Sequence, residues 1–174
     1  MLMTIDELKS FIETSESDAM LEARLSALEF MIRGYTNNNF QDTARRCKAV
    51  ITDGRIYSDV IPFKVGDTVQ ISQSECNNGL YTVEAVAEGY FTVVEDVDDD
   101  RGSRITKVKY PPDVKIGAAN LIKWETDNKD KAGIASETIS RHSVTYVAAD
   151  AANSVAGYPK TMLGFLRPYR KARF

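Results

Sequence analysis

Apolar residues recur at helical spacing in the stretch from Asp18 to Asn38. They repeat in alternating steps of four and three residues, at Leu21, Leu25, Leu28, Ile32 and Tyr35. Because side chains return to the same face of an α-helix about every 3.6 residues, this pattern predicts a long amphipathic helix. Asp18 is the predicted N-cap, and Gly34 followed by the Asn37–Asn39 run indicates the end. Other segments must cover the apolar stripe, since such a helix is not stable alone in water.

Helical patterns also occur at the start of the chain and in its last third. Residues 4–14 begin with capping-box spacing between Thr4 and Glu7 and continue with an apolar face. A proline pair opens a second amphipathic helix over 111–128, because a proline in the first helical turn loses no hydrogen bond. The remaining predicted elements of this part are one strand and a short last helix, at 143–147 and 159–166.

Between these helical stretches the period of the pattern changes to two. Apolar and polar residues alternate over 68–72, 81–85 and 91–93. The runs are separated by turn residues, namely Gly66-Asp67, Asn77-Asn78-Gly79 and Glu88-Gly89. Short alternating strands with such turns predict a small antiparallel barrel, and the order of these segments resembles an SH3-like barrel.

The two kinds of pattern predict an α+β fold with two parts. Residues 1–52 and 111–174 are expected to form a small helical bundle domain. Residues 53–110 are expected to form the antiparallel β-module, inserted into that domain, because insertions enter at surface loops whose ends are already close.

Composition and charge narrow the function classes. The 174 residues are 43% hydrophobic, which predicts a globular chain, and the net charge is -3. A general nucleic-acid binder needs excess Lys and Arg, so this charge argues against one, although not against a protein along which DNA slides. With no apolar run near ~20 residues and no signal-peptide profile, the sequence predicts a soluble intracellular product.

The residues usually found in active sites are sparse. His142 is the sole histidine, which nearly excludes a histidine triad or a zinc cluster. Cys47 and Cys76 fit no metal-ligand spacing and are expected to be reduced thiols, with a single bridge left open. The basic neighbours of Cys47 can lower its pKa, which is the one argument for a nucleophile, but an idle thiol is favoured.

The acidic run from Glu95 to Asp100 looks at first like a calcium-binding loop. The glycine that an EF-hand requires falls one place late, at Gly102, and the last position is Lys107 rather than glutamate. A solvated acidic loop is therefore expected, and the sequence predicts no catalytic, cofactor or metal site.

Basic and aromatic residues are interleaved at the C-terminal end without any acid. We expect Pro168 to end the last helix, so that the arm after it is extended and free to order on a partner. Arginines and aromatics are common interface anchors, which predicts a docking arm, while a solvated tail and a nucleic-acid arm are alternatives. The candidate docking residues are Arg167, Tyr169, Arg170, Lys171, Arg173 and Phe174.

Both flanks of the chain resemble head-tail connector (adaptor) proteins of long-tailed phages and prophages. The opening TIDELKSFIETSESDAMLEARLSALEFMIRGYTNNNF is similar to the start of that family. The closing part has a proline-led helix, then G-I-x-S-E-x-I from Gly133 to Ile139 and S-V-T-Y from Ser143 to Tyr146. It ends in L-x-P-Y-R-x-x-R from Leu166 to Arg173. The β-module departs from the shortest members of the family.

The resemblance implies a virion protein without enzymatic activity. It would form a ring, usually a dodecamer, under the portal of a DNA-filled capsid, after passing through the host cytoplasm. There it would extend the DNA conduit and join head to tail. Its expected partners are the portal protein through the C-terminal segment, neighbouring copies, and the next connector or stopper protein. DNA would pass without specific binding, and no membrane is involved.

A second interpretation is a small nucleic-acid-binding or regulatory module built on the SH3-like insert. A basic stripe with interleaved aromatics on the strands would favour it. The acidic residues on those strands disfavour it, namely Glu84, Glu88, Glu95 and Asp96.

Overall fold

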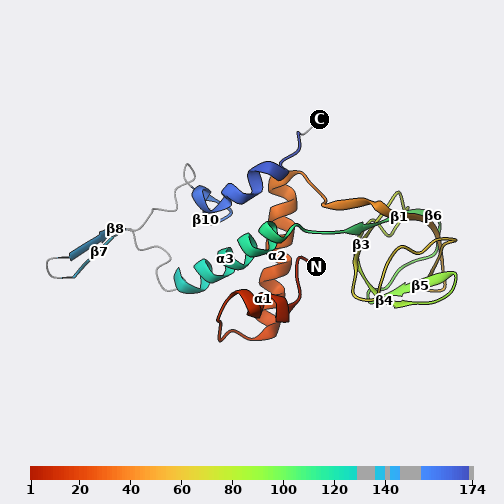
Figure 1. Ribbon diagram of the computed structural model, residues 1–174, viewed down its shortest axis with the longest axis horizontal. Helices are drawn as coiled ribbons and strands as arrows, with labels where there is room; N and C mark the ends of the chain where they lie inside the picture. The colour runs from red at the N-terminus through yellow and green to blue at the C-terminus, as the bar shows by residue number, and fades with distance from the viewer. Residues whose placement is uncertain (129–135, 140–141, 146–153, 173–174) are drawn as a thin grey trace. The chain divides into compact units, whose positions relative to one another are not determined.

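The computed structural model describes residues 1–128, 136–139, 142–145 and 154–172 (Figure 1). The chain divides into two compact units. A barrel unit consists of Met1 and Asn39–Tyr110, and a helical unit consists of Leu2–Asn38 and Pro111–Phe174. The fold is therefore α+β, with a β-rich unit between two stretches of a largely helical one.

Six strands form a closed antiparallel barrel with the spatial order β1-β2-β5-β4-β3-β6. Closure leaves no unpaired strand edge within the barrel. The strands are β1 (Gln41–Thr52), β2 (Arg55–Tyr57), β3 (Thr68–Ser72), β4 (Gly79–Val86), β5 (Tyr90–Val93) and β6 (Asp100–Val108).

Alternate strand residues fill the barrel with apolar side chains. Phe63, from the segment before β3, places its ring 5.4 Å from that of Phe91 in an edge-on arrangement. Gly66 and Gly89 have positive φ, which only glycine adopts without strain, as the turn predictions at both places required. The buried cluster consists of Ala49, Ile51, Ile56, Phe63, Val69, Ile71, Val83, Phe91, Val93 and Ile105.

The predicted boundary of the β-module at residue 53 is wrong. Gln41–Thr52 is a strand of the barrel, paired with β6 and β2, and the barrel unit begins at Asn39. Its alternation is weak in the sequence because the inward positions include Cys47 and Ala49, which are small. Arg46 and Lys48, on either side of Cys47, are exposed. A bulge after Asp42 also shifts the register.

The chain enters and leaves the barrel unit at adjacent points. The backbone N–H of Lys109 donates to the carbonyl of Phe40 at 2.9 Å. The rings of Phe40 and Tyr110 lie 4.8 Å apart, and both side chains are buried. The two connections to the helical unit therefore start from neighbouring positions in space.

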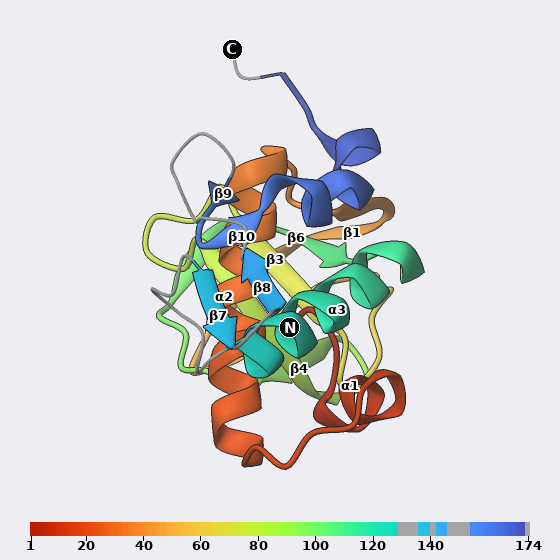
Figure 2. The ribbon, with the colours of Figure 1, turned by 90° about the vertical axis from the view of Figure 1, so that its left-hand side faces the viewer.

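The helical unit contains three α-helices and a 3₁₀-helix among the residues described (Figure 2). Helices α1, α2 and α3 contact one another, and the 3₁₀-helix η2 contacts α2 and α3. The unit also contains two short hairpins. Of their strands, the sequence pattern predicted only the one at 143–147. The elements are α1 (Ile5–Phe11), α2 (Asp18–Thr36), α3 (Pro112–Asn128), β7 (Ser136–Ile139), β8 (His142–Thr145), β9 (Ser154–Val155), β10 (Tyr158–Pro159) and η2 (Lys160–Tyr169).

The predicted stripe of α2 is buried at Leu21, Leu25, Leu28 and Ile32, which confirms the amphipathic helix. The N-cap is Ser17 rather than Asp18, because the Ser17 hydroxyl accepts from the Met20 N–H at 3.4 Å. Asp18 is instead the first helical residue, where the positive end of the helix dipole stabilises its negative charge. Asn37 ends the helix in the left-handed region, as predicted for that run.

Replacing residues 39–110 by a short glycine-serine linker should leave a folded helical unit, since the ends lie close together. Replacing only 54–109 should give a less stable product, because β1 would lose β2 and β6 and leave its strand edges unpaired. Circular dichroism and thermal melting of both variants test this. A 39–110 variant without helical signal would contradict the separation of the units.

Candidate partner-binding site

The C-terminal segment, residues 167–172, is packed against its own unit rather than free. Pro168 lies within η2 instead of ending it, since the fixed φ of proline suits a 3₁₀ turn. Leu163 and Leu166 anchor the helix as buried residues. A Cβ added at Gly117 of α3 would lie 2.5 Å from the ring of Phe165, so the absence of a side chain there lets η2 approach α3 closely. The extended arm predicted after residue 166 is therefore wrong for the residues up to 172.

Backbone groups of the C-terminal segment close the end of α2. The last carbonyls of a helix have no partner within it. The Lys171 N–H donates to the carbonyl of Thr36 at 2.8 Å. Asn37 Nδ2 donates to the Ala172 carbonyl at 2.8 Å, and Asn38 Nδ2 donates to the Tyr169 carbonyl at 3.1 Å. Residues more than 130 positions apart in sequence are thereby held together.

The side chains of the same segment reach the first turn of α3 and the last turns of α2. The Tyr169 hydroxyl lies 2.8 Å from both carboxylate oxygens of Asp113 and donates to that group. This hydrogen bond, followed by burial, raises the pKa of Tyr169 above its ordinary value. The Arg170 guanidinium lies 5.2 Å from the centre of the Tyr35 ring, a cation–π arrangement.

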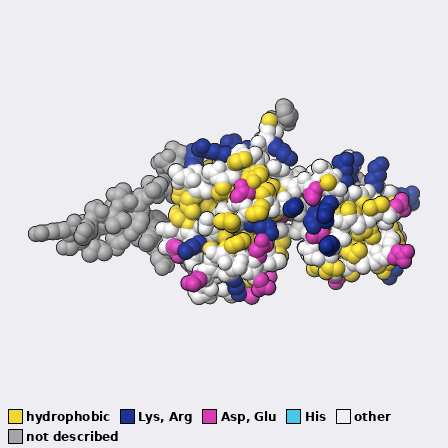
Figure 3. All heavy atoms as spheres, in the orientation of Figure 1, with side chains coloured by type: hydrophobic (Ala, Val, Ile, Leu, Met, Phe, Trp, Pro, Cys, Tyr) yellow, Lys and Arg dark blue, Asp and Glu magenta, His cyan; other side chains and the backbone are white. Residues whose placement is uncertain are grey.

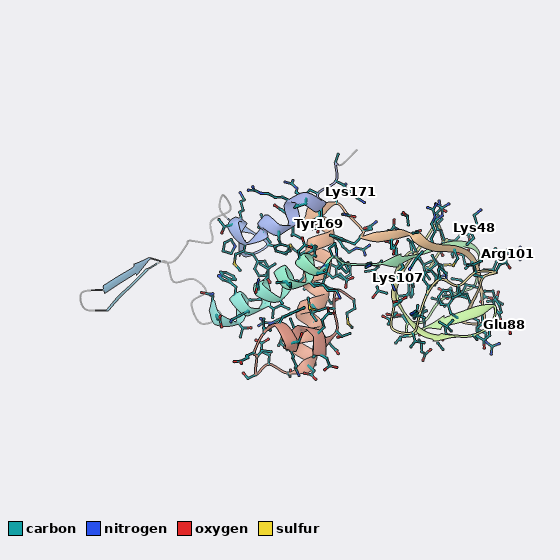
Figure 4. The ribbon with its side chains drawn as sticks, viewed as in Figure 1. Lys48, Glu88, Arg101, Lys107, Tyr169 and Lys171 are labelled. Atoms are coloured by element: carbon teal, nitrogen blue, oxygen red, sulfur yellow. The ribbon has the colours of Figure 1, made fainter. Side chains whose placement is uncertain are left out.

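What remains on the surface of this segment is positive charge. Arg167, Arg170 and Lys171 are exposed, and Figure 4 shows Tyr169 and Lys171 on the same part of the helical unit. Arg173 and Phe174 lie outside the described residues. Of the six candidate residues, Tyr169 is partly buried and hydrogen-bonded to Asp113, and three are exposed cations.

Sequence reasoning missed the residues that hold the segment, which are Thr36, Asn37, Asn38 and Asp113. The asparagine run was interpreted only as a helix end. Asn side chains also donate hydrogen bonds, and three in a row at a helix end were the available signal.

The other candidate groups are the two cysteines and the acidic run. Cys47 and Cys76 are both free thiols, so no bridge joins them. Cys47 is half-buried and faces inward, and burial raises the pKa of its thiol, contrary to the lowering expected from its basic neighbours. Those neighbours at 46 and 48 are exposed, because adjacent strand residues point to opposite faces.

The end of the acidic run organises the loop between β3 and β4. The Asp100 carboxylate accepts from the Ser103 hydroxyl and the Glu75 N–H, each at 3.1 Å, and from the Gly102 N–H at 3.0 Å. A further hydrogen bond from Ser74 is the main reason that the pKa of Asp100 is lowered. Among the described residues, no three His, Cys, Asp or Glu side chains are grouped so that they could hold a metal ion.

No family model matches the chain, and no curated protein matches it. Within the described ranges, none of the helices combines the length and the apolar character needed to cross a membrane.

Ionisation of Tyr169 should weaken the helical unit. A raised folded-state pKa means that the stabilisation is present below the ordinary tyrosine value of about 10 and is lost as the pH rises through the folded value. Urea unfolding of the wild type and of Tyr169→Phe, from pH 8 upward, measures this. The stability advantage of the wild type should shrink above about pH 10. A difference that stays constant across that range would show that the Asp113 contact does not form.

Proposed function

We propose that this chain is a structural head-tail connector (adaptor) of a tailed phage or prophage. In this role it forms a ring under the portal, extends the DNA conduit and joins the head to the tail, without enzymatic activity. Its place is the head-tail junction of the virion, and the host cytoplasm before assembly.

The observation that supports the proposal most is the meeting of the segments on which the resemblance rests. The opening segment ends at Asn38, the closing segment begins with the proline pair before Asp113, and the final motif contains Tyr169. Tyr169 is hydrogen-bonded to both Asn38 and Asp113. Three separate parts of the resemblance therefore contribute to one contact, as expected if they descend from one fold rather than matching by chance.

Within this proposal the six-stranded barrel is an SH3-like module carried by the connector. It is inserted at residues 39–110, between the end of α2 and the start of α3. The portal, the neighbouring copies of the ring and the next connector or stopper protein are the partners of the helical unit.

The portal-docking surface in this proposal consists of Arg167, Arg170 and Lys171 on a fixed base. Because the backbone beneath them is already held by Thr36 and Asn37, docking orders fewer degrees of freedom than a free arm would. Exposed cations on a rigid surface suit a partner that presents carboxylates at the matching positions.

Charge reversal tests this surface without removing the segment that closes α2. The variant Arg167→Glu/Lys171→Glu should retain the wild-type melting temperature, since both side chains are exposed. It should lose about tenfold or more in affinity for the portal protein of the phage or prophage that encodes the chain. Surface plasmon resonance on immobilised portal measures it.

The matched control is Lys64→Glu/Lys123→Glu, which changes the net charge equally at exposed positions elsewhere. It should bind the portal as the wild type does. Equal portal binding by wild type and the Arg167→Glu/Lys171→Glu variant would refute the docking surface, and no portal binding by any of the three would refute the connector role.

A further inference from the structure

The outer face of strands β1 and β6 carries a cluster of positive charge. Cys47, Ala49 and Ile51 face into the barrel, so Arg46 and Lys48, on either side of Cys47, face outward. Figure 3 shows Lys and Arg side chains gathered along one edge of the barrel unit. We define the basic face as Arg45, Arg46, Lys48, Arg101 and Arg104, all exposed except for the half-buried Arg104. Arg45 lies in the bulge between Asp42 and Arg46, where the alternation of β1 is interrupted.

The strand register places like charges opposite each other on this face. Lys48 pairs directly with Arg104 across the β1–β6 ladder. Like charges at such positions destabilise a sheet. None of the five cations forms an ion pair with any residue that the structure describes, whereas Lys107 on the same strand is paired with Asp67. The barrel therefore bears an uncompensated electrostatic cost at this face.

The acidic residues of the barrel lie elsewhere or are already engaged. Figure 4 shows Lys48 on the upper side of the barrel and Glu88 on its lower side, with Arg101 between them at the right. Glu84 accepts from the Thr92 hydroxyl at 3.1 Å, and Glu95 accepts from the Thr82 N–H at 2.9 Å. The acids that argued against nucleic-acid binding in the sequence are thus on β4, in the β4–β5 turn and in the loop after β5. Strands β1 and β6 carry two acids of their own, and these accept hydrogen bonds from nearby backbone N–H groups: Asp42 from Ala44 and Asp100 from Gly102.

We propose that the basic face binds the phosphate backbone of double-stranded DNA without reading its sequence. Cations two residues apart on a strand stand about 6.7 Å apart. Duplex DNA carries a negative charge about every 1.7 Å of its axis. The cations can therefore contact phosphates wherever the face lies along the duplex. The cations stand on strands of a closed barrel, with no helix or ribbon placed among them to enter the major groove and contact base edges.

The neighbouring aromatics favour a duplex over a single strand. Tyr57 and Tyr90 lie across the β2–β5 ladder from each other, with ring centres 5.6 Å apart and planes tilted by 43°. The Arg55 guanidinium lies 5.2 Å from the centre of the Tyr90 ring. Tyr57 is exposed, but the Tyr90 ring packs against both Tyr57 and Arg55, so these strands do not present a row of open aromatic faces like those on which single-strand binders stack successive bases.

This inference goes beyond the connector proposal and does not rest on it, because the charge distribution of the barrel alone supports it. Contacts to about three or four phosphates predict a slope near -3 in log affinity against log salt concentration. Binding should be weak at physiological salt, with a Kd of about 10⁻⁴ to 10⁻⁶ M, as usual for non-specific complexes. Such contacts attract passing DNA without holding it.

The test uses the full chain and fluorescently labelled duplexes of about 30 base pairs with two unrelated sequences, in about 20 mM salt. Fluorescence anisotropy should give equal affinities for the two sequences. Arg46→Glu/Lys48→Glu should bind about tenfold or more weakly, since two phosphate contacts become repulsive. The matched control Lys64→Glu/Lys123→Glu should stay within about twofold of the wild type.

Thermal melting verifies the fold of each variant, and Arg46→Gln/Lys48→Gln replaces the reversal if the glutamates unfold the barrel. That variant should still bind severalfold more weakly than the wild type. The proposal is overturned if the wild type does not bind the duplex, as expected for a face that meets an acidic protein instead. Equal losses in the matched control, or a single strand bound about tenfold better than the duplex, also overturn it.

Discussion

The hydrogen bond from the Lys171 N–H to the Thr36 carbonyl closes the helical unit at the place where its chain is interrupted. Helix α2 ends and α3 begins on either side of the barrel insertion, so their ends are not joined by a short loop. Tyr169 supplies the link, since it accepts from Asn38 through its carbonyl and donates to Asp113 through its hydroxyl. A segment from the C-terminus thus completes a fold that an insertion divides.

The two units present different positive surfaces. On the helical unit, Arg167 and Lys171 stand on a backbone that is held by hydrogen bonds, which suits a specific partner. On the barrel, Lys48 and Arg104 lie opposite each other on neighbouring strands. This arrangement suits a partner whose negative charges repeat at short, regular intervals. A chain with a net charge of -3 can therefore present a local cationic surface on its barrel unit, because most acids of that unit lie in turns and loops.

Local sequence patterns predicted the elements that bury a single face. Leu21, Leu25 and Leu28 repeat at helical spacing because a single face of α2 is buried, and that repeat was sufficient. Strand β1 was missed because small inward residues and a bulge weaken its period. The position of residues 167–172 was predicted wrongly because it depends on side chains such as Asn38 and Asp113, which are distant in sequence. Hydrogen bonds over such separations leave no local period to detect.

The central claim is that the helical unit is a connector built to assemble on a portal. Electron microscopy of the purified chain mixed with its portal protein tests this most directly. The account predicts an additional ring of density on one end of the portal, with the same rotational axis. Portal particles that show no added density, while the chain remains folded in the same sample, would contradict it.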